Sequence, residues 1–224
     1  MKYLLFLLLA LQSTLAAAHS SCSSEGVKPV KHLTERFIQA DCAACWTSPM
    51  ATPKSGLVLD WIVPSAAGDD AALSAAANRD AGERHNALAL AFTAGQQLHR
   101  TTISAPAAYQ LRVAHGLPVN GYIGTSVELK KHPKSVKTLT SYLLLVEYLP
   151  KGTADSPIDR LLVRNMQQES WNLTSQPTLP KLLTRRPMSI PAGVHPDNLR
   201  VVGWVQDAKG HILTMAQSRC ITRP

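Results

Sequence analysis

Apolar and polar residues alternate in short runs along most of the chain, and this pattern predicts strands. The run His32 to Ala40 alternates in this way, and Leu57 to Val63 is almost continuously apolar, as in a strand buried within a sheet. Strands at this spacing, separated by turn residues, indicate an antiparallel sandwich or an open sheet. Seven later segments carry the same signature: 101–104, 109–115, 122–130, 140–149, 160–167, 199–207 and 211–218.

Helical patterns are few. The alanine-rich stretch from Ala71 to Asp80 predicts a helix whose first turn Asp69 and Asp70 can cap. The segment that follows, 87–94, is interpreted as a strand. The chain is therefore expected to be α+β and β-rich.

Two connections stand out. The segment 170–196 contains several prolines and is expected to cross between the layers of the β structure. Residues 207–210 predict a hairpin turn with Gly210 at the position that needs a positive φ angle.

The first eighteen residues have the pattern of a secretory signal peptide. A charged start precedes an apolar run from Leu4 to Leu11, and small residues lead to a predicted cut after Ala18. The apolar run is much shorter than the roughly 20 residues that span a bilayer. No later stretch is long and apolar enough to do so. We therefore expect an exported protein, periplasmic or secreted, that does not span the membrane after cleavage.

The formal net charge of +8 is unevenly distributed. Residues 112–224 hold fifteen Lys or Arg against seven Asp or Glu, whereas residues 19–111 are nearly balanced. A basic C-terminal half can meet an anionic component of the cell envelope, the alternative being a solvated surface that only maintains solubility. The basic residues are scattered, with no aromatic stacking platform between them, which argues against nucleic acid as a partner.

Four cysteines follow the predicted cleavage site: Cys22, Cys42, Cys45 and Cys220. An even number in an exported chain predicts two disulfides, with three connectivities to choose from. Cys42 and Cys45 are close enough in sequence to pair with each other. This leaves Cys22 and Cys220 for a structural disulfide between the two ends of the mature chain.

The spacing of Cys42 and Cys45 is that of a redox-active dithiol. Thiol–disulfide exchange needs a thiolate that attacks, here Cys42, and a second thiol that resolves the mixed disulfide, here Cys45. A helix that begins at Cys42 can last only about two turns, because Pro49 and Pro53 would end it. Asp41 places a negative charge beside Cys42 and disfavours its thiolate.

Two alternatives to redox chemistry stay open for this pair. It can be a stable structural disulfide, or it can contribute ligands to a metal site together with histidines. The histidines show no clustered ligand spacing, and the chain carries neither a serine-hydrolase motif nor a phosphate loop, so no metal or cofactor is expected. The histidines considered as ligands are His32, His85, His99, His115, His132, His195 and His211.

Several features together resemble a family of exported bacterial proteins of unknown function. They are a strand that leads into the cysteine pair, a buried strand with Asp60 and Trp61, a helix with Arg79 and Arg84, and a terminal hairpin containing Val205-Gln206-Asp207. That family joins a thioredoxin-like N-terminal part to a β-rich C-terminal part.

The resemblance implies a thioredoxin-like part over residues 19–100 and a β-rich domain over residues 101–224. The leading functional hypothesis, which the cysteine pair itself suggests, is weak thiol–disulfide oxidoreductase activity at Cys42 and Cys45, with a protein thiol or disulfide as partner. The alternative, from a different functional class, is a non-enzymatic binding or accessory module whose disulfides only stabilise the fold.

The signal-peptide pattern yields a first testable prediction. Export should remove residues 1–18, so that the mature chain begins at or near His19. Intact-mass analysis of the exported protein measures this directly. A mass that retains the first eighteen residues would contradict the interpretation.

Overall fold

The computed structural model describes residues 22–48, 56–92, 95–103, 108–133, 136–174 and 182–220. The predicted signal peptide and the predicted mature N-terminus lie outside these ranges. Within the described part of the chain, every helix is too short or too polar to traverse a bilayer.

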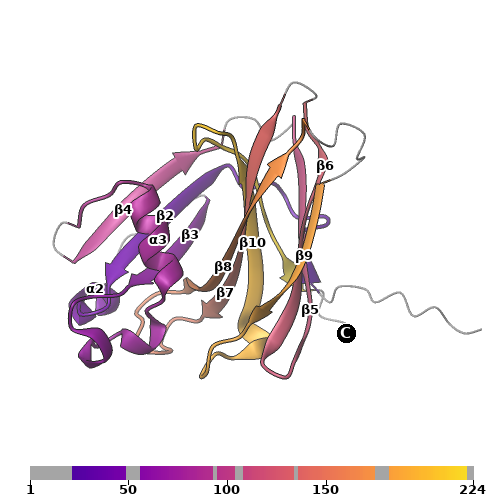
Figure 1. Cartoon of the computed structure of the whole chain (residues 1–224). Coiled ribbons are helices and arrows are strands. Elements are labelled where there is room, and N and C mark those ends of the chain that lie inside the picture. The colour runs from indigo at the N-terminus through magenta and orange to yellow at the C-terminus, as the bar shows by residue number, and fades with distance from the viewer. Residues whose placement is uncertain are drawn as a thin grey trace, which may run out of the picture.

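The larger of two sheets has seven strands in the order β11-β10-β7-β8-β3-β2-β4. It combines strands from both halves of the chain, because β3, which neighbours β2 and through it β4, lies beside β8 (Figure 1). The sequence predicted antiparallel strands, yet β2 with β3 and β3 with β8 are parallel. Parallel neighbours need a crossover connection, and helix α2 (Ala43–Thr47) lies within the one that joins β2 to β3. The seven strands are β2 (His32–Gln39), β3 (Leu57–Val63), β4 (Gln96–Thr102), β7 (Thr138–Leu149), β8 (Arg160–Asn172), β10 (Leu199–Gln206) and β11 (Ile212–Gln217).

The smaller sheet has five antiparallel strands in the order β12-β1-β5-β6-β9. Its two short strands hold the expected disulfide, because Cys22 on β1 lies opposite Cys220 on β12 and is bonded to it, with a Cα–Cα distance of 4.0 Å. The ends of the described chain therefore lie side by side. The strands are β1 (Cys22–Ser23), β5 (Gln110–Val119), β6 (Tyr122–Lys131), β9 (Leu182–Ser189) and β12 (Arg219–Cys220).

Alternating side chains place the two sheets face to face. Val113 of β5 and Val127 of β6 are fully buried together with Leu145 of β7 and Val201 of β10. Because successive side chains of a strand point to opposite faces, the next residues of β7 and β10 face away from the smaller sheet. They form a second core with β2, β3 and helix α3 (Arg79–Ala87), which lies in front of these strands in Figure 1.

Helix α2 covers strands β2 and β3 on the face of the seven-stranded sheet opposite to α3. Its Trp46 packs with Ile38 of β2 and Ile62 of β3, which alternate with the residues that face α3. The seven-stranded sheet is thus covered on one face by α3 and on the other by the smaller sheet and α2. This arrangement puts the two cysteines at the start of α2 on the side of the protein away from α3.

The predicted helix over Ala71 to Asp80 is wrong. That segment contains a short 3-10 turn, η2 (Ser74–Ala76), and the α-helix begins only at Arg79. Backbone bonds to the sheet hold the segment in place of a helix, since Leu73 N–H donates to the Ala40 carbonyl and Asn78 N–H to that of Ile62.

The expected helix cap and the expected strand after it are also wrong. Asn78 caps α3 through its Oδ1, which accepts from Ala81 N–H at 2.8 Å, whereas Asp69 and Asp70 belong to an earlier turn, η1 (Gly68–Asp70). Of the predicted strand 87–94, residue 87 ends α3, residues 88–89 form a turn and residues 90–92 are irregular, because Leu88 N–H still bonds to carbonyls of the helix. The following strand, β4, begins at Gln96 rather than at residue 101.

The connection 170–196 does cross between the sheets, as expected, but it contains a strand. β9 pairs with β6 at the edge of the smaller sheet and packs Leu182 and Met188 into the core. β9 contains Pro187, which is tolerated because β9 is an edge strand and one of its sides needs no ladder hydrogen bonds. The turn 207–210 is confirmed, with Gly210 at φ +83° between β10 and β11.

A buried ion pair holds α3 on the sheet. The guanidinium of Arg84 donates to both carboxylate oxygens of Glu35 on β2, at 2.9 and 2.7 Å. The same guanidinium lies over the rings of Tyr142 and Trp204, 5.5 and 5.0 Å from their centroids. Both charged side chains are almost fully buried, so each depends on the other for compensation.

Replacing Arg84 by alanine should therefore lower the free energy of unfolding by about 3–5 kcal/mol, because Glu35 would remain buried without its partner. Urea denaturation followed by circular dichroism measures the loss. The matched control is Arg79→Ala on the same helix, which removes the exposed ion pair to Glu83 and should cost no more than about 1 kcal/mol. Equal losses in the two variants would contradict this account.

Candidate functional site

The Cys42–Cys45 pair lies where β2 ends and α2 begins. Ala40 N–H donates to the Val63 carbonyl of β3 at 2.9 Å, and the Ala40 carbonyl accepts from Leu73 N–H at 2.8 Å. These bonds fix the backbone just before Cys42, which occupies the N-cap position of α2. The helix is short, as predicted, and ends at Thr47 before an extended Ser48, the conformation favoured in front of a proline.

Cys42 and Cys45 form a disulfide, and the two residues differ in exposure. Cys42 is half-buried, whereas Cys45 is only 8% exposed and packs into the core between α2 and the sheet. Cys42 is therefore the more exposed residue of the pair. The structure places these predicted site residues together, and it keeps Cys22 and Cys220 apart from them in the other sheet.

Gly95, just before β4, lies against this disulfide. A methyl group added at its Cα would sit 2.7 Å from the Cys42 sulfur, closer than real contacts allow, and 3.2 Å from the Cys45 sulfur, tighter than most real contacts. Its carbonyl accepts from Gln39 N–H at 2.9 Å, and its φ angle is +76°. The sequence carries no signal for Gly95, because its contact with the sulfurs arises only from the pairing of β4 with β2.

Trp46 is clamped behind the cysteine pair. Its indole N–H donates to the Ala154 carbonyl at 2.6 Å, and the Arg160 guanidinium lies 4.0 Å from the ring centroid. Arg160 also donates to the Trp46 backbone carbonyl at 2.5 Å. These contacts attach the short helix α2 to β8 and the loop before it.

A buried carboxylate extends this clamp into the sheet. Asp60 of β3 is fully buried and accepts through Oδ1 from Arg36 of β2 and, at 3.4 Å, from Arg160 of β8. Ser156 accepts from Arg160 Nε at 2.7 Å. Burial lowers the pKa of Arg160, and the charge of Asp60 opposes this effect. One carboxylate thus joins three strands to α2.

An apolar cavity of about 450 Å³ opens beside α2. Asp155 and Arg164 are the charged residues that contribute to its wall. The apolar lining includes Ala43, Trp46, Leu73, Ala76, Leu149 and Leu162.

A metal-ligating arrangement is present elsewhere. Across the described ranges, the one group of three close metal-ligand side chains consists of Cys22, His115 and Cys220, and it does not include Cys42 or Cys45. Its two cysteines are joined by the disulfide between β1 and β12. The sequence could not single out His115, since only strand pairing brings it to the cysteines.

No family model and no curated protein matches the sequence. Among solved structures, the chain is similar to HBP35 of Porphyromonas gingivalis with a TM-score of 0.50 and 10% identity, over 88% of this chain and 80% of that chain. A crystal structure of chicken MD-1 complexed with lipid IVa gives a TM-score of 0.21 and 10% identity, over 53% of this chain and 93% of that chain. The first similarity supports the β-rich fold alone, and the second is too weak to support an inference.

The contact between Gly95 and the disulfide yields a test. In Gly95→Ala the added methyl crowds the Cys42 sulfur, and reduction relieves this because a thiol side chain can rotate away. We expect the equilibrium with dithiothreitol to shift at least about tenfold toward the reduced pair, equivalent to about 1.4 kcal/mol. Quantitative thiol alkylation with mass spectrometry measures the shift.

The control is Gly210→Ala, which has the same kind of positive φ but open space around the added methyl. It should destabilise the fold through backbone strain without changing the reduction of the cysteine pair. If both variants shift the equilibrium equally, the contact at Gly95 does not control the disulfide.

Proposed function

We propose that this chain is an exported, weak thiol–disulfide exchange protein that acts through Cys42 and Cys45. The observation that supports it most is the position of the pair, where β2 ends and α2 begins, with Cys42 at the N-cap. In this position Cys42, the more exposed residue of the two, meets a partner, and the buried Cys45 resolves the intermediate.

The reaction is a sequence of two exchanges. With the pair reduced, the Cys42 thiolate attacks a sulfur of a partner disulfide, one partner sulfur leaves as a thiolate, and a mixed disulfide forms. The Cys45 thiolate then attacks the Cys42 sulfur and releases the second partner thiolate. The pair ends oxidised and the partner reduced, and the same steps in reverse oxidise a partner dithiol.

Local architecture supports a divergent thioredoxin-like N-terminal part. A parallel β2–α2–β3 unit carries a cysteine pair at the start of its helix, which is the arrangement expected from the resemblance. The two disulfides and the signal-peptide pattern support export, since disulfides persist mainly in oxidising compartments.

Two features of the site disfavour fast thiol–disulfide exchange. Helix α2 has only five residues and therefore a weak dipole, and Asp41 adds a negative charge beside Cys42. The thiolate of Cys42 is consequently poorly stabilised. We infer slow turnover compared with a dedicated oxidoreductase.

The test is thiol trapping across a glutathione redox series. In the folded protein the Cys42–Cys45 pair should become reduced before Cys22–Cys220, because it closes a short loop at the start of a helix, whereas Cys22–Cys220 joins two paired strands. A Cys45→Ser variant should accumulate a mixed disulfide on Cys42, since the resolving thiol is missing. The matched Cys42→Ser variant should accumulate far less, because Cys45 is buried. Reduction of both disulfides only on unfolding, with no mixed disulfide on Cys42, would refute the proposal.

A second candidate, a binding module for an anionic envelope lipid, rests on the end of the smaller sheet where β5 turns into β6. Leu117, Val119 and Tyr122 are 73%, 65% and 56% exposed at the turn between β5 and β6. A surface hollow of about 740 Å³ lies beside this turn, and Arg185 and Arg186 contribute to its lining. Exposed apolar side chains next to cations suit an amphiphile with an anionic headgroup.

Vesicle flotation tests this lipid-binding candidate separately from the exchange function. The protein should bind vesicles that contain anionic lipid and not vesicles of phosphatidylcholine alone. A Leu117→Ser/Val119→Ser variant should lose at least about tenfold in affinity, because two apolar side chains no longer enter the lipid. Equal binding to both vesicle types, or by both protein forms, argues against this role.

A further inference from the structure

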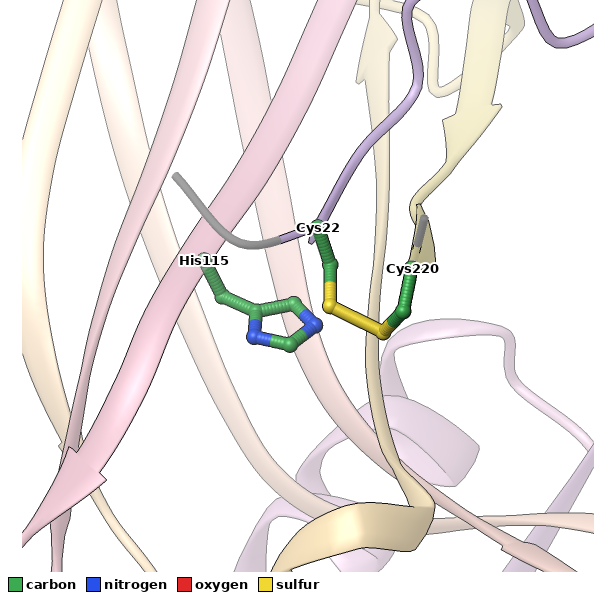
Figure 2. Close-up of side chains that lie close together, drawn as sticks. All are labelled: Cys22, His115 and Cys220. Atoms are coloured by element: carbon green, nitrogen blue, oxygen red, sulfur yellow. A yellow bond between two sulfur atoms is a disulfide. The ribbon is translucent and has the colours of Figure 1, made fainter. Parts of the chain in front are cut away.

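One row of side chains crosses three neighbouring strands of the smaller sheet. Cys220 on β12 lies opposite Cys22 on β1, and Cys22 lies opposite His115 on β5. Residues directly opposite one another in a sheet project to the same face. Figure 2 shows the imidazole turned toward the disulfide, and one ligand atom from each of the three residues lies within 4.8 Å of the others.

The imidazole presents its outer nitrogen as an acceptor. His115 is only 5% exposed, and its Nδ1 lies 3.0 Å from the Gly116 carbonyl oxygen. A carbonyl only accepts, so Nδ1 carries the hydrogen and donates it, which leaves a lone pair on Nε2. Within the described part of the chain, Nε2 has no hydrogen-bond partner. Burial lowers the pKa of His115, which favours the neutral ring.

We propose that reduction of the Cys22–Cys220 disulfide converts this row into a zinc site with Cys22, Cys220 and His115 Nε2 as ligands. Two thiolates and an imidazole are ligands that zinc prefers, and they leave a fourth tetrahedral position for solvent. The Nδ1–H bond to a backbone carbonyl fixes the ring tautomer as it does in known metal sites.

The chemistry needs a reductant and releases protons. A dithiol reductant transfers two electrons and two protons to the disulfide, which becomes two thiols, while the reductant is oxidised to a disulfide. Zinc then displaces the two thiol protons to solvent and bonds to both sulfurs. Unlike the proposed exchange function, this step does not involve Cys42 or Cys45.

The required movement is small. Zinc–sulfur bonds of about 2.3 Å in a tetrahedron hold two sulfurs about 3.8 Å apart and a sulfur and a nitrogen about 3.6 Å apart. The sulfurs must therefore separate, and the nitrogen already lies within 4.8 Å of both. Zinc would replace a covalent link between β1 and β12 by a coordinate link between the same residues.

The experiment uses the Cys42→Ser/Cys45→Ser double variant, so that only Cys22 and Cys220 can supply thiols. The protein is reduced with a phosphine without denaturant, its fold is checked by near-ultraviolet circular dichroism, and Co²⁺ is titrated as a spectroscopic substitute for Zn²⁺. We expect one cobalt ion per chain with thiolate charge-transfer absorption, displaced by Zn²⁺, and no such absorption in the oxidised protein.

A histidine variant tests the third ligand. His115→Gln should weaken metal binding at least about tenfold, because even loss of an outer-shell partner costs 10- to 100-fold in affinity. The matched control is His85→Gln, which removes another buried histidine with an unpartnered Nε2, one that packs against Phe37 and Phe92, and it should bind as tightly as the parent.

A measurement on the parent double variant does not depend on the folding of His115→Gln. The ¹¹³Cd chemical shift of the reduced, cadmium-loaded protein should indicate two sulfurs and one nitrogen. Absence of thiolate absorption with Co²⁺, a shift without nitrogen, equal affinity in His115→Gln, or reduction only on unfolding would each overturn the proposal.

Discussion

The burial of Asp60 is the constraint on which the arrangement around the cysteine pair depends. A carboxylate with no exposed surface is tolerated only with close cationic partners, here Arg36 and Arg160. Those partners come from β2 and β8, on either side of β3, so the charge requirement aligns three strands. The guanidinium of Arg160 in turn lies over the Trp46 ring and donates a hydrogen bond to the Trp46 backbone carbonyl. A helix of five residues, too short to be stable alone, is in this way attached to the sheet.

The two disulfides connect different kinds of elements and close loops of very different length. Cys22–Cys220 lies within paired strands and links residues 198 apart in sequence, a loop closure that can contribute about 5 kcal/mol in the chain-entropy model. Cys42–Cys45 closes a very short loop at a helix start, where it adds little to stability. The first bond therefore suits a structural role, and the second supports the proposed exchange chemistry.

Local patterns were sufficient for much of the fold. The apolar run at β3 and the glycine turn before β11 were predictable, because strand burial and turn conformation are decided by neighbouring residues. The alanine-rich segment 71–80 was not, because its backbone bonds to Ala40 and Ile62 override its helix propensity. Similarly, the cysteine spacing indicated the site, whereas Gly95 and Arg160 reach it only through the pairing of distant strands.

The reduction potential of the Cys42–Cys45 pair, measured in the folded protein against a dithiol redox buffer, tests the central claim most directly. A pair that takes part in exchange should have a potential above roughly −300 mV, whereas structural disulfides of exported proteins lie below that value. We expect the higher value, with Cys22–Cys220 still oxidised at that potential. A value below roughly −300 mV would contradict the account and leave the pair as a second structural link.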